Sequence, residues 1–352
     1  FINHILRERL GFKGYVNSDS GVTSKMCWGV EDKSEAERFA KAVNAGTDLV
    51  ADTNDITNLK KAIENGWISE KRINEANVRL LTEMFALGLF DDRTYVSPED
   101  ATLVVKNQAN WEAAYEAHKK SVTVLKNTNQ TLPLTADKLG NKKVYVEVFH
   151  KEPERATAYT EKARQECQEL GQFTLTDNHE EADIAILFLS PKSGAYFNAT
   201  PGLLELEICE DKTETALDGS TYQETTLSGM DHLKEVADSI HVRGGKVIMS
   251  VNVILPWILG NVEPLADVLI AGYDTYYKAQ YEVIAGNSRP VGVLPLTLPA
   301  SEAVIAVDEN GDCMSRNDVP GYDKDKYMPE GLTYAYKDSD GNVYKLGHGL
   351  TY

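Results

Sequence analysis

Four short apolar runs in the second half of the chain constrain its fold more than any other feature. They are rich in Val and Ile and almost continuously apolar: KVYVEVF (143–149), ADIAILFLS (182–190), KVIMSVN (246–252) and ADVLIAGY (266–273). Strands of this kind are covered on both faces, as in parallel sheets with helices on either side. Helical patterns at 153–170, 229–243 and 275–286 separate the runs. The sequence therefore predicts an α/β domain with a mainly parallel sheet.

The first ninety residues also alternate helix and strand. Short strands are expected at about 14–18 and 47–52, and helices at 2–10, 35–46, 55–66 and 69–88. In the last helix, an apolar stripe at helical spacing is expected to be core: Ile73, Ala76, Leu80, Met84 and Leu87. This pattern is typical of the βα units of an α/β protein.

A chain of 352 residues is too long for one ordinary core, so two domains are expected. The polar texture of 91–135, with one helix at about 109–121, indicates a linker between a domain at 1–90 and a domain at 136–352. In the tail, KDSDGNVYK (337–345) reads as a hairpin turn between short strands.

Composition excludes several classes of function. A net charge of −18 repels phosphate backbones and anionic membranes, so neither a nucleic acid nor a membrane is an expected partner. The four cysteines lie far apart without zinc spacing, and the acidic tail lacks a full calcium loop, so no metal is expected. No glycine-rich phosphate loop follows a strand, so no nucleotide cofactor is expected. Nothing in the sequence assigns a cellular compartment.

One acid stands at the end of an early strand. The octet GYVNSDSG (14–21) places Asp19 after a short apolar run, and Gly21 allows the backbone to turn. Catalytic groups of α/β barrels lie where strands end, and a carboxylate there can attack the anomeric carbon of a sugar. The same residue can equally be a helix cap or an Asx-turn at a strand exit. The octet by itself leaves both interpretations open.

Six motifs in consistent order decide between them. The chain resembles glycoside hydrolase family 3 in LRERLGFKGYVNSDSG (6–21), AVNAGTDLV (42–50), ISEKRINEANVRLLTEMFALGLF (68–90), AHKKSVTVLKNTNQTLPL (117–134), GVLPLTLPAS (292–301) and LGHGLTY (346–352). The resemblance implies the last βα units of a (β/α)8 barrel followed by an α/β sandwich domain. It also implies a retaining, exo-acting β-glycosidase, similar to a β-glucosidase, with Asp19 as the nucleophile.

The resemblance places the general acid/base in the second domain, on the loop after the strand at 182–190. Retaining enzymes hold the two carboxyl groups about 5–5.5 Å apart. We expect Glu205 or Glu207 to be this group, because the alternating apolar residues Leu204, Leu206 and Ile208 favour a small strand that turns one acid inward. The same loop carries Glu210, Glu214 and Glu224, and each of these glutamates can also be a solvated surface residue.

Three further residues are expected to bind substrate. Ser20 follows the nucleophile where the family often has a large aromatic residue or Met, which leaves the leaving-group subsite undecided. Trp28 is the candidate platform on the same loop, and Tyr196 is a candidate for stacking on a sugar ring; core or loop packing is the alternative for both.

The family's earlier barrel strands have no counterpart in this sequence, and two βα units cannot close a barrel. We expect either that the chain is the carboxyl-terminal part of a longer enzyme, or that a second chain supplies the rest. Alone, it is expected to lack glycosidase activity. The family hydrolyses β-glucosides, β-xylosides and N-acetylglucosaminides, and these residues do not select among them. The alternative is a non-catalytic carbohydrate-binding or interaction protein on the same fold.

Overall fold

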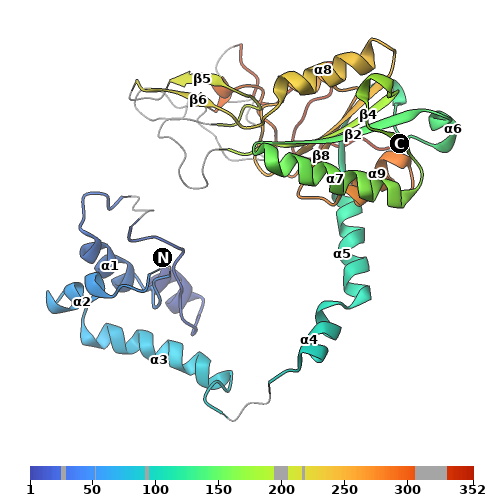
Figure 1. The fold of residues 1–352 in the computed structure, drawn as a ribbon. Coiled ribbons are helices and arrows are strands. Elements are labelled where there is room, and N and C mark those ends of the chain that lie inside the picture. Colours follow the sequence, from blue (N-terminus) through green and yellow to red (C-terminus); the bar gives the residue numbers. More distant parts are fainter. Residues whose placement is uncertain (25–28, 52, 92–94, 194–204, 216–218, 306–330) are drawn as a thin grey trace. The chain divides into compact units, whose positions relative to one another are not determined.

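The computed structural model describes residues 1–24, 29–51, 53–91, 95–193, 205–215, 219–305 and 331–352. The chain divides into two compact units, Phe1–Val105 and Lys106–Tyr352, which are drawn in Figure 1. Each unit is described by itself below. The domain limits predicted at 90 and 135 stay a prediction.

The first unit is mainly helical in the residues described. Its elements are the π-helical segment η1 (Ile2–Arg9), α1 (Glu35–Asn44), α2 (Thr57–Glu64), α3 (Glu70–Ala86) and α4 (Pro98–Val105). Local sequence explains where they begin. The Ser34 hydroxyl accepts a hydrogen bond from the Glu37 N–H, and the Glu37 carboxylate accepts one from the Ser34 N–H, which together form a capping box for α1. Ser69 caps α3, as predicted.

The two strands predicted in this unit are reduced to a short parallel contact. Asn17 and Leu49 form an isolated bridge, and the Ser18 N–H donates to the Leu49 carbonyl at 2.9 Å. A small apolar cluster beneath it comprises Ala40, Val43, Ala62 and Ile68. Each predicted strand is therefore present as an extended segment with one partner.

The apolar stripe predicted as core on α3 is wrong toward its end. Ala76 is buried and Ile73 packs against the cluster of the first unit, but Met84 is 38% exposed and Leu87 is 65% exposed. The spacing identified a helix with one apolar face. Within the described part of this unit, the cluster covers that face at its amino-terminal end alone.

The second unit is an α/β domain. Its strands are β1 (Thr123–Asn127), β2 (Lys143–His150), β3 (Thr174–Thr176), β4 (Ile184–Ser190), β5 (Lys212–Thr215), β6 (Thr221–Glu224), β7 (Lys246–Asn252) and β8 (Val268–Gly272). Its α-helices are α5 (Gln108–Ser121), α6 (Ala136–Leu139), α7 (Pro153–Leu170), α8 (Met230–His241) and α9 (Tyr277–Ala285). Single 3-10 turns are η2 (Thr128–Gln130), η3 (His179–Glu181), η4 (Glu263–Leu265) and η5 (Glu302–Val304).

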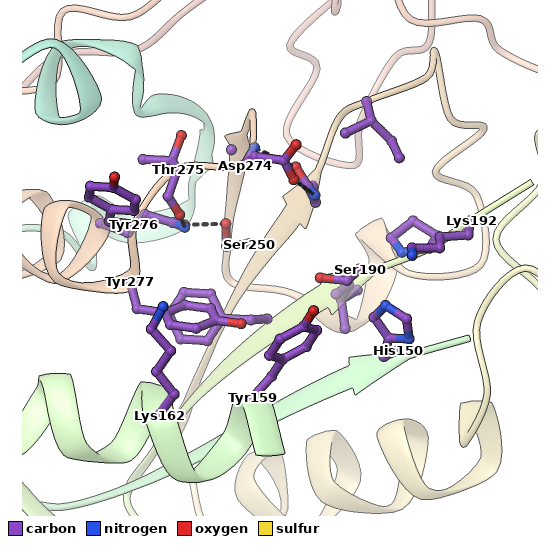
Figure 2. Close-up of a pocket in the computed structure, with 17 residues that line it drawn as sticks. His150, Tyr159, Lys162, Ser190, Lys192, Ser250, Asp274, Thr275, Tyr276 and Tyr277 are labelled. Atoms are coloured by element: carbon purple, nitrogen blue, oxygen red, sulfur yellow. Dashed lines mark hydrogen bonds between the residues drawn. The ribbon is translucent and has the colours of Figure 1, made fainter. Parts of the chain in front are cut away.

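The main sheet has six strands in the order β1-β8-β7-β4-β2-β3. All neighbouring pairs are parallel except β1 with β8, so the predicted mainly parallel sheet is confirmed. Because the five other strands run the same way, the carboxyl ends of β2, β4, β7 and β8 meet at one edge. A cavity opens there, and its lining residues are drawn in Figure 2.

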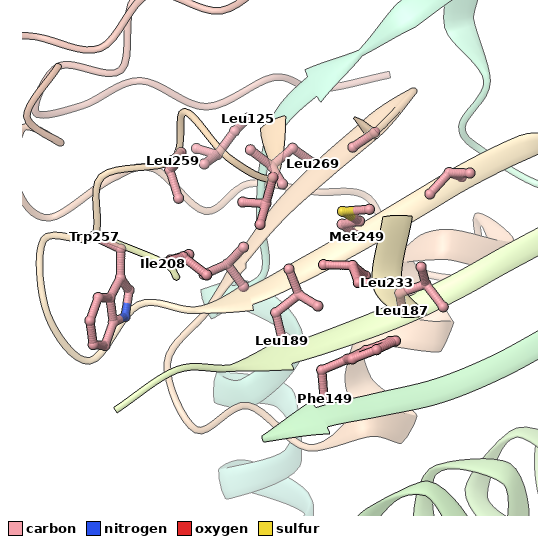
Figure 3. Packing of buried hydrophobic residues seen from close by; sticks show 14 of the residues in the cluster. Leu125, Phe149, Leu187, Leu189, Ile208, Leu233, Met249, Trp257, Leu259 and Leu269 are labelled. Carbon is pink, nitrogen blue, oxygen red and sulfur yellow. The ribbon is translucent and has the colours of Figure 1, made fainter. Parts of the chain in front are cut away.

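Buried apolar residues pack against both faces of this sheet. Along β4, Ala185, Leu187 and Leu189 belong to the cluster that includes residues of α8, and part of this cluster is drawn in Figure 3. The intervening residues Ile184, Ile186 and Phe188 belong to the cluster with residues of α7 and α9. Successive strand residues point to opposite faces, so a strand buried on both faces must be apolar throughout.

The pairing of β1 and the tail hairpin complete the described fold. Strand β1 lies within the segment expected as a linker, yet it pairs antiparallel with β8 and places Val124 and Leu125 in the core. The tail hairpin predicted at 337–345 is confirmed by the antiparallel bridge of Lys337 with Val343. Among the described residues, no helix has the length and apolarity to cross a membrane.

Candidate active site

Asp19 lies directly after the parallel contact between the segments around Asn17 and Leu49. Its side chain is exposed, and its Oδ1 accepts a hydrogen bond from the Ser20 N–H at 2.7 Å. The Ser18 hydroxyl donates to the Asp19 carbonyl at 2.8 Å. Asp19 Oδ2 receives no hydrogen bond from the residues that the structure describes, so this oxygen is available to an incoming group.

A buried ion cluster holds this strand end in place. The Asp48 side chain has no exposed surface and receives Arg7, Arg72 and Arg79 at 2.5, 2.9 and 2.8 Å. The Val16 N–H also donates to its Oδ2 at 3.0 Å. Burial alone would raise the pKa of Asp48, but the Val16 N–H and the guanidinium groups outweigh burial and lower it. Asp48 therefore fixes the segment that presents Asp19.

Of the three residues expected to bind substrate, the structure describes Ser20 alone. Ser20 is exposed, and its N–H donates to the carboxylate of the preceding residue, Asp19. Trp28 and Tyr196 lie outside the described residues. The proposed roles of all three stay predictions.

The loop glutamates gather around one lysine. Lys212 Nζ forms ion pairs with Glu207, Glu214 and Glu302, the last at 3.0 Å. Glu207 also accepts from Asn261 Nδ2 at 2.9 Å and forms a parallel bridge with Ile258. Ile208 is fully buried and anchors this stretch, whereas Leu206 is half-buried and Leu204 lies outside the described residues, so the small strand expected from the alternation stays a prediction.

Carboxylate oxygens of Glu207, Glu214 and Glu302 lie within 4.8 Å of one another. The Lys212 ammonium occupies the centre of this group and provides the positive charge that a metal ion would otherwise bring. Lys212 therefore offsets the repulsion among the three carboxylates.

Glu205 and Glu207 differ in their surroundings. Glu205 is 9% exposed and accepts a hydrogen bond from the Ser193 hydroxyl at 3.2 Å. Its φ of 43° is uncommon for a residue with a side chain, and such conformations cluster at functional sites. Glu207, in contrast, has both oxygens engaged, one by Lys212 and one by Asn261. Of the two acids, Glu205 has fewer hydrogen-bond and ion-pair partners among the described residues.

A third acid, Glu224, is the most buried of the group. It is 2% exposed, and neither carboxyl oxygen has a hydrogen-bond partner among the described residues. Its pKa is raised to about 7, mainly by burial; the positive charge of Lys212 lowers the pKa, and the negative charges of Glu302, Glu214 and Glu205 raise it. The Tyr222 hydroxyl is also buried without a partner. The sequence gave no sign of the burial of Glu224.

None of these residues lines the cavity at the carboxyl edge of the sheet. The candidate groups therefore form two clusters in the described structure, one around Asp19 in the first unit and one around Lys212 in the second.

Comparison with known proteins indicates a family. Residues 1–83 match the Glycosyl hydrolase family 3 N terminal domain. The chain is 29% identical to the probable beta-glucosidase C of Aspergillus flavus over 367 aligned residues, which span 100% of this chain and 48% of that protein. A periplasmic beta-glucosidase/beta-xylosidase of Dickeya chrysanthemi is 30% identical over 206 aligned residues, 53% of this chain and 28% of that protein. The chain spans about half the length of the first of these relatives.

Solved structures show the same fold. A beta-glucosidase from Listeria innocua in complex with glucose superposes with a TM-score of 0.64 at 21% identity, over 99% of this chain and 48% of that one. A b-glucosidase from Erythrobacter marinus superposes with a TM-score of 0.66 at 18% identity, over 99% and 49%.

Proposed function

Since the chain is related to glycoside hydrolase family 3, as expected from its motifs, we propose that it carries both catalytic carboxyl groups of a retaining, exo-acting β-glycosidase. The substrate is a terminal, non-reducing β-linked sugar of an oligosaccharide or glycoside. The observation that carries the proposal is the match of residues 1–83, which contains Asp19 at the end of its strand. In this proposal the first unit is the end of a (β/α)8 barrel and the second is the α/β sandwich.

Asp19 is the nucleophile in this proposal. A retaining mechanism needs a carboxylate with an accessible oxygen to form a glycosyl-enzyme intermediate. The exposed Asp19 side chain and its unengaged Oδ2 support that role, and the ion cluster around Asp48 supports the positioning of the strand end.

The acid/base is one of the loop glutamates, Glu205 or Glu207. A general acid must hold a proton and release it to the leaving oxygen. Within the described residues Glu205 accepts one hydrogen bond, from Ser193, and this favours it over Glu207, which is paired with Lys212. Glu224 is a second candidate, because its raised pKa of about 7 keeps it half-protonated near neutral pH.

The nucleophile is tested in a completed enzyme, which is this chain fused to the missing barrel segment of the Aspergillus flavus relative. Asp19→Asn is expected to lower kcat on aryl β-glucosides and β-xylosides on the order of 10³-fold or more. Asp32→Asn is the matched control, because Asp32 is exposed and pairs with its neighbour Lys33. A 2-fluoro-glycoside that accumulates the intermediate should label the peptide containing residue 19. Unchanged turnover of Asp19→Asn in a folded protein would support the non-catalytic carbohydrate-binding alternative.

The acid/base is identified by its dependence on the leaving group. Glu205→Gln, Glu207→Gln and Glu224→Gln are compared on two substrates. The leaving group of a 2,4-dinitrophenyl glycoside departs without protonation, whereas that of an alkyl glycoside must be protonated. The acid/base variant should lose activity on the alkyl glycoside far more, and added azide should restore its turnover of the activated substrate. Equal losses on both substrates for all three variants would contradict the assignment to this loop.

The isolated 352-residue chain is expected to be inactive on these substrates, because the remaining barrel strands come from the same polypeptide or from a second chain. Robust turnover by the isolated chain would refute this part of the proposal.

A further inference from the structure

The cavity at the carboxyl edge of the main sheet has a volume of about 480 Å³. It lies where β2 and β4 are neighbours, with β3 beyond β2 on one side and β7 beyond β4 on the other. The chain reverses its direction across the sheet at this point. Open α/β sheets bind their ligands outside the carboxyl ends of strands at such a switch point, and the volume suits a small molecule.

One wall of the cavity begins with a neutral histidine at the end of β2. His150 is 2% exposed, and its Nδ1 accepts a hydrogen bond from the Glu152 N–H at 2.9 Å. Burial lowers its pKa, and the positive charge of Lys192 lowers it further. A neutral ring whose Nδ1 accepts must carry its hydrogen on Nε2. His150 is therefore a hydrogen-bond donor among the lining residues of Figure 2.

Three further polar groups line the same wall without partners of their own. Figure 2 shows the Tyr159 hydroxyl directed toward Ser190, with Lys192 beyond it. Within the described parts of the chain, no side chain or backbone group bonds Tyr159 Oη, Ser190 Oγ or Lys192 Nζ. Tyr159 is held edge-on against His150, with ring centroids 5.6 Å apart. Donors of this kind, one of them a full positive charge, converge on an oxygen-rich anionic group.

The opposite wall offers a different chemistry. Asn252 and Asp274 bridge the ends of β7 and β8 by two hydrogen bonds of 2.7 and 2.8 Å. Asp274 adopts a φ of 52°, a conformation uncommon for any residue but glycine, asparagine or aspartate. The bridge fixes a carboxylate and an amide side by side, and such a pair suits the adjacent hydroxyl groups of a sugar or polyol. Tyr277 and Phe188 supply apolar surface between the two walls.

We propose that this cavity binds a monosaccharide-sized polyol that carries an anionic group, either a carboxylate or a phosphate. The anionic group lies against Lys192, Ser190 and Tyr159, and the hydroxyl groups lie against Asn252 and Asp274. Asp19 and the glutamates around Lys212 are not among the lining residues, so the proposal goes beyond the proposed glycosidase activity and does not depend on it.

Calorimetric titration of the 352-residue chain tests the site with three probes: gluconate, glucose 6-phosphate and glucose. At least one charged probe should bind at least tenfold more tightly than glucose. Comparison of gluconate with glucose 6-phosphate then distinguishes a carboxylate ligand from a phosphate ligand. No binding of either charged probe, or equal binding of glucose, would overturn the proposal.

Variants locate the binding. Lys192→Gln removes the charge, and Tyr159→Phe removes a hydroxyl without changing the packing of the ring; each should weaken the charged probe about tenfold. Lys143→Gln is the matched control, because Lys143 begins β2 at the opposite edge of the sheet and pairs with Glu181. Thermal unfolding of each variant shows whether it is folded. Equal affinity in Lys192→Gln and Lys143→Gln would refute the site even if the chain binds the probe.

Discussion

Replacing Glu224 with Gln should stabilise the protein at alkaline pH. The buried Glu224 carboxyl group has no hydrogen-bond partner among the described residues, and its pKa is raised from 4.5 to about 7. A tenfold change in an equilibrium constant corresponds to about 1.4 kcal/mol, so the rise amounts to about 3 kcal/mol. Ionised Glu224 therefore lowers the free energy of unfolding by about 3 kcal/mol, whereas Gln carries no charge.

The direction of the pH dependence follows from the same values. Between pH 4.5 and about 7 the folded protein keeps the proton of Glu224 while the unfolded chain releases it. The contribution of Glu224 is therefore fully present below pH 4.5 and is lost as the pH rises through about 7. Glu224→Gln should match the wild type near pH 4.5 and exceed it by about 3 kcal/mol at pH 8.

Urea unfolding at pH 4.5, 6 and 8, monitored by circular dichroism, measures the difference in free energy of unfolding between Glu224→Gln and the wild type. Hydrogen exchange of the β5–β6 amides is a second readout. The second readout reports the hairpin that carries Glu224 if it opens before the rest. Glu161→Gln, an exposed acid on α7, should change stability by less than about 0.5 kcal/mol at every pH. A Glu224→Gln variant that is no more stable than the wild type at pH 8 would refute the reasoning.

Three further substitutions test buried contacts within the two units. Glu263→Gln should lower the free energy of unfolding by about 3–5 kcal/mol in urea titrations, because it leaves the buried Lys126 ammonium, now 2.6 Å from Glu263 Oε1, without a counter-charge; an unchanged midpoint would contradict this. Asp48→Asn should lower the free energy of unfolding by ~3–5 kcal/mol, because three guanidinium groups lose their shared carboxylate. It should also speed hydrogen exchange of the backbone amides in the first unit. Gly292→Ala should lower the free energy of unfolding by about 1–3 kcal/mol, because the new Cβ would lie 2.5 Å from a backbone oxygen. Gly260→Ala is the control, because its Cβ would meet no atom within 4 Å. Equal melting temperatures of the two variants would contradict the prediction.

The sequence predicted the second unit well because its signals are local. Continuous apolar runs give buried parallel strands, and glycines such as Gly171 and Gly286, both in the left-handed conformation, end helices where expected. Strand β1 was missed because its polar context resembles a linker. Its pairing with β8 is a contact between residues far apart in sequence, which no local pattern reveals.

For the candidate site, too, local sequence predicted some features and tertiary contacts decided the others. The motif around Asp19 could be recognised from consecutive residues, and the loop that carries the glutamates could be located by the strand before it. The environment of each acid could not. Glu207 and Glu224 both lie between β4 and α8, yet Lys212 pairs with Glu207, whereas buried Glu224 has no hydrogen-bond partner among the described residues.

By itself, the sequence determined the resemblance to glycoside hydrolase family 3, the α/β fold of the second unit and the segment that bears the proposed nucleophile, because each is set by the order and polarity of neighbouring residues. Tertiary structure alone decided the raised pKa of Glu224, the buried pairing of Asp48 and the donor-rich wall formed by His150, Ser190 and Lys192. These depend on distance and on exclusion from water, and both are properties of residues brought together from different elements.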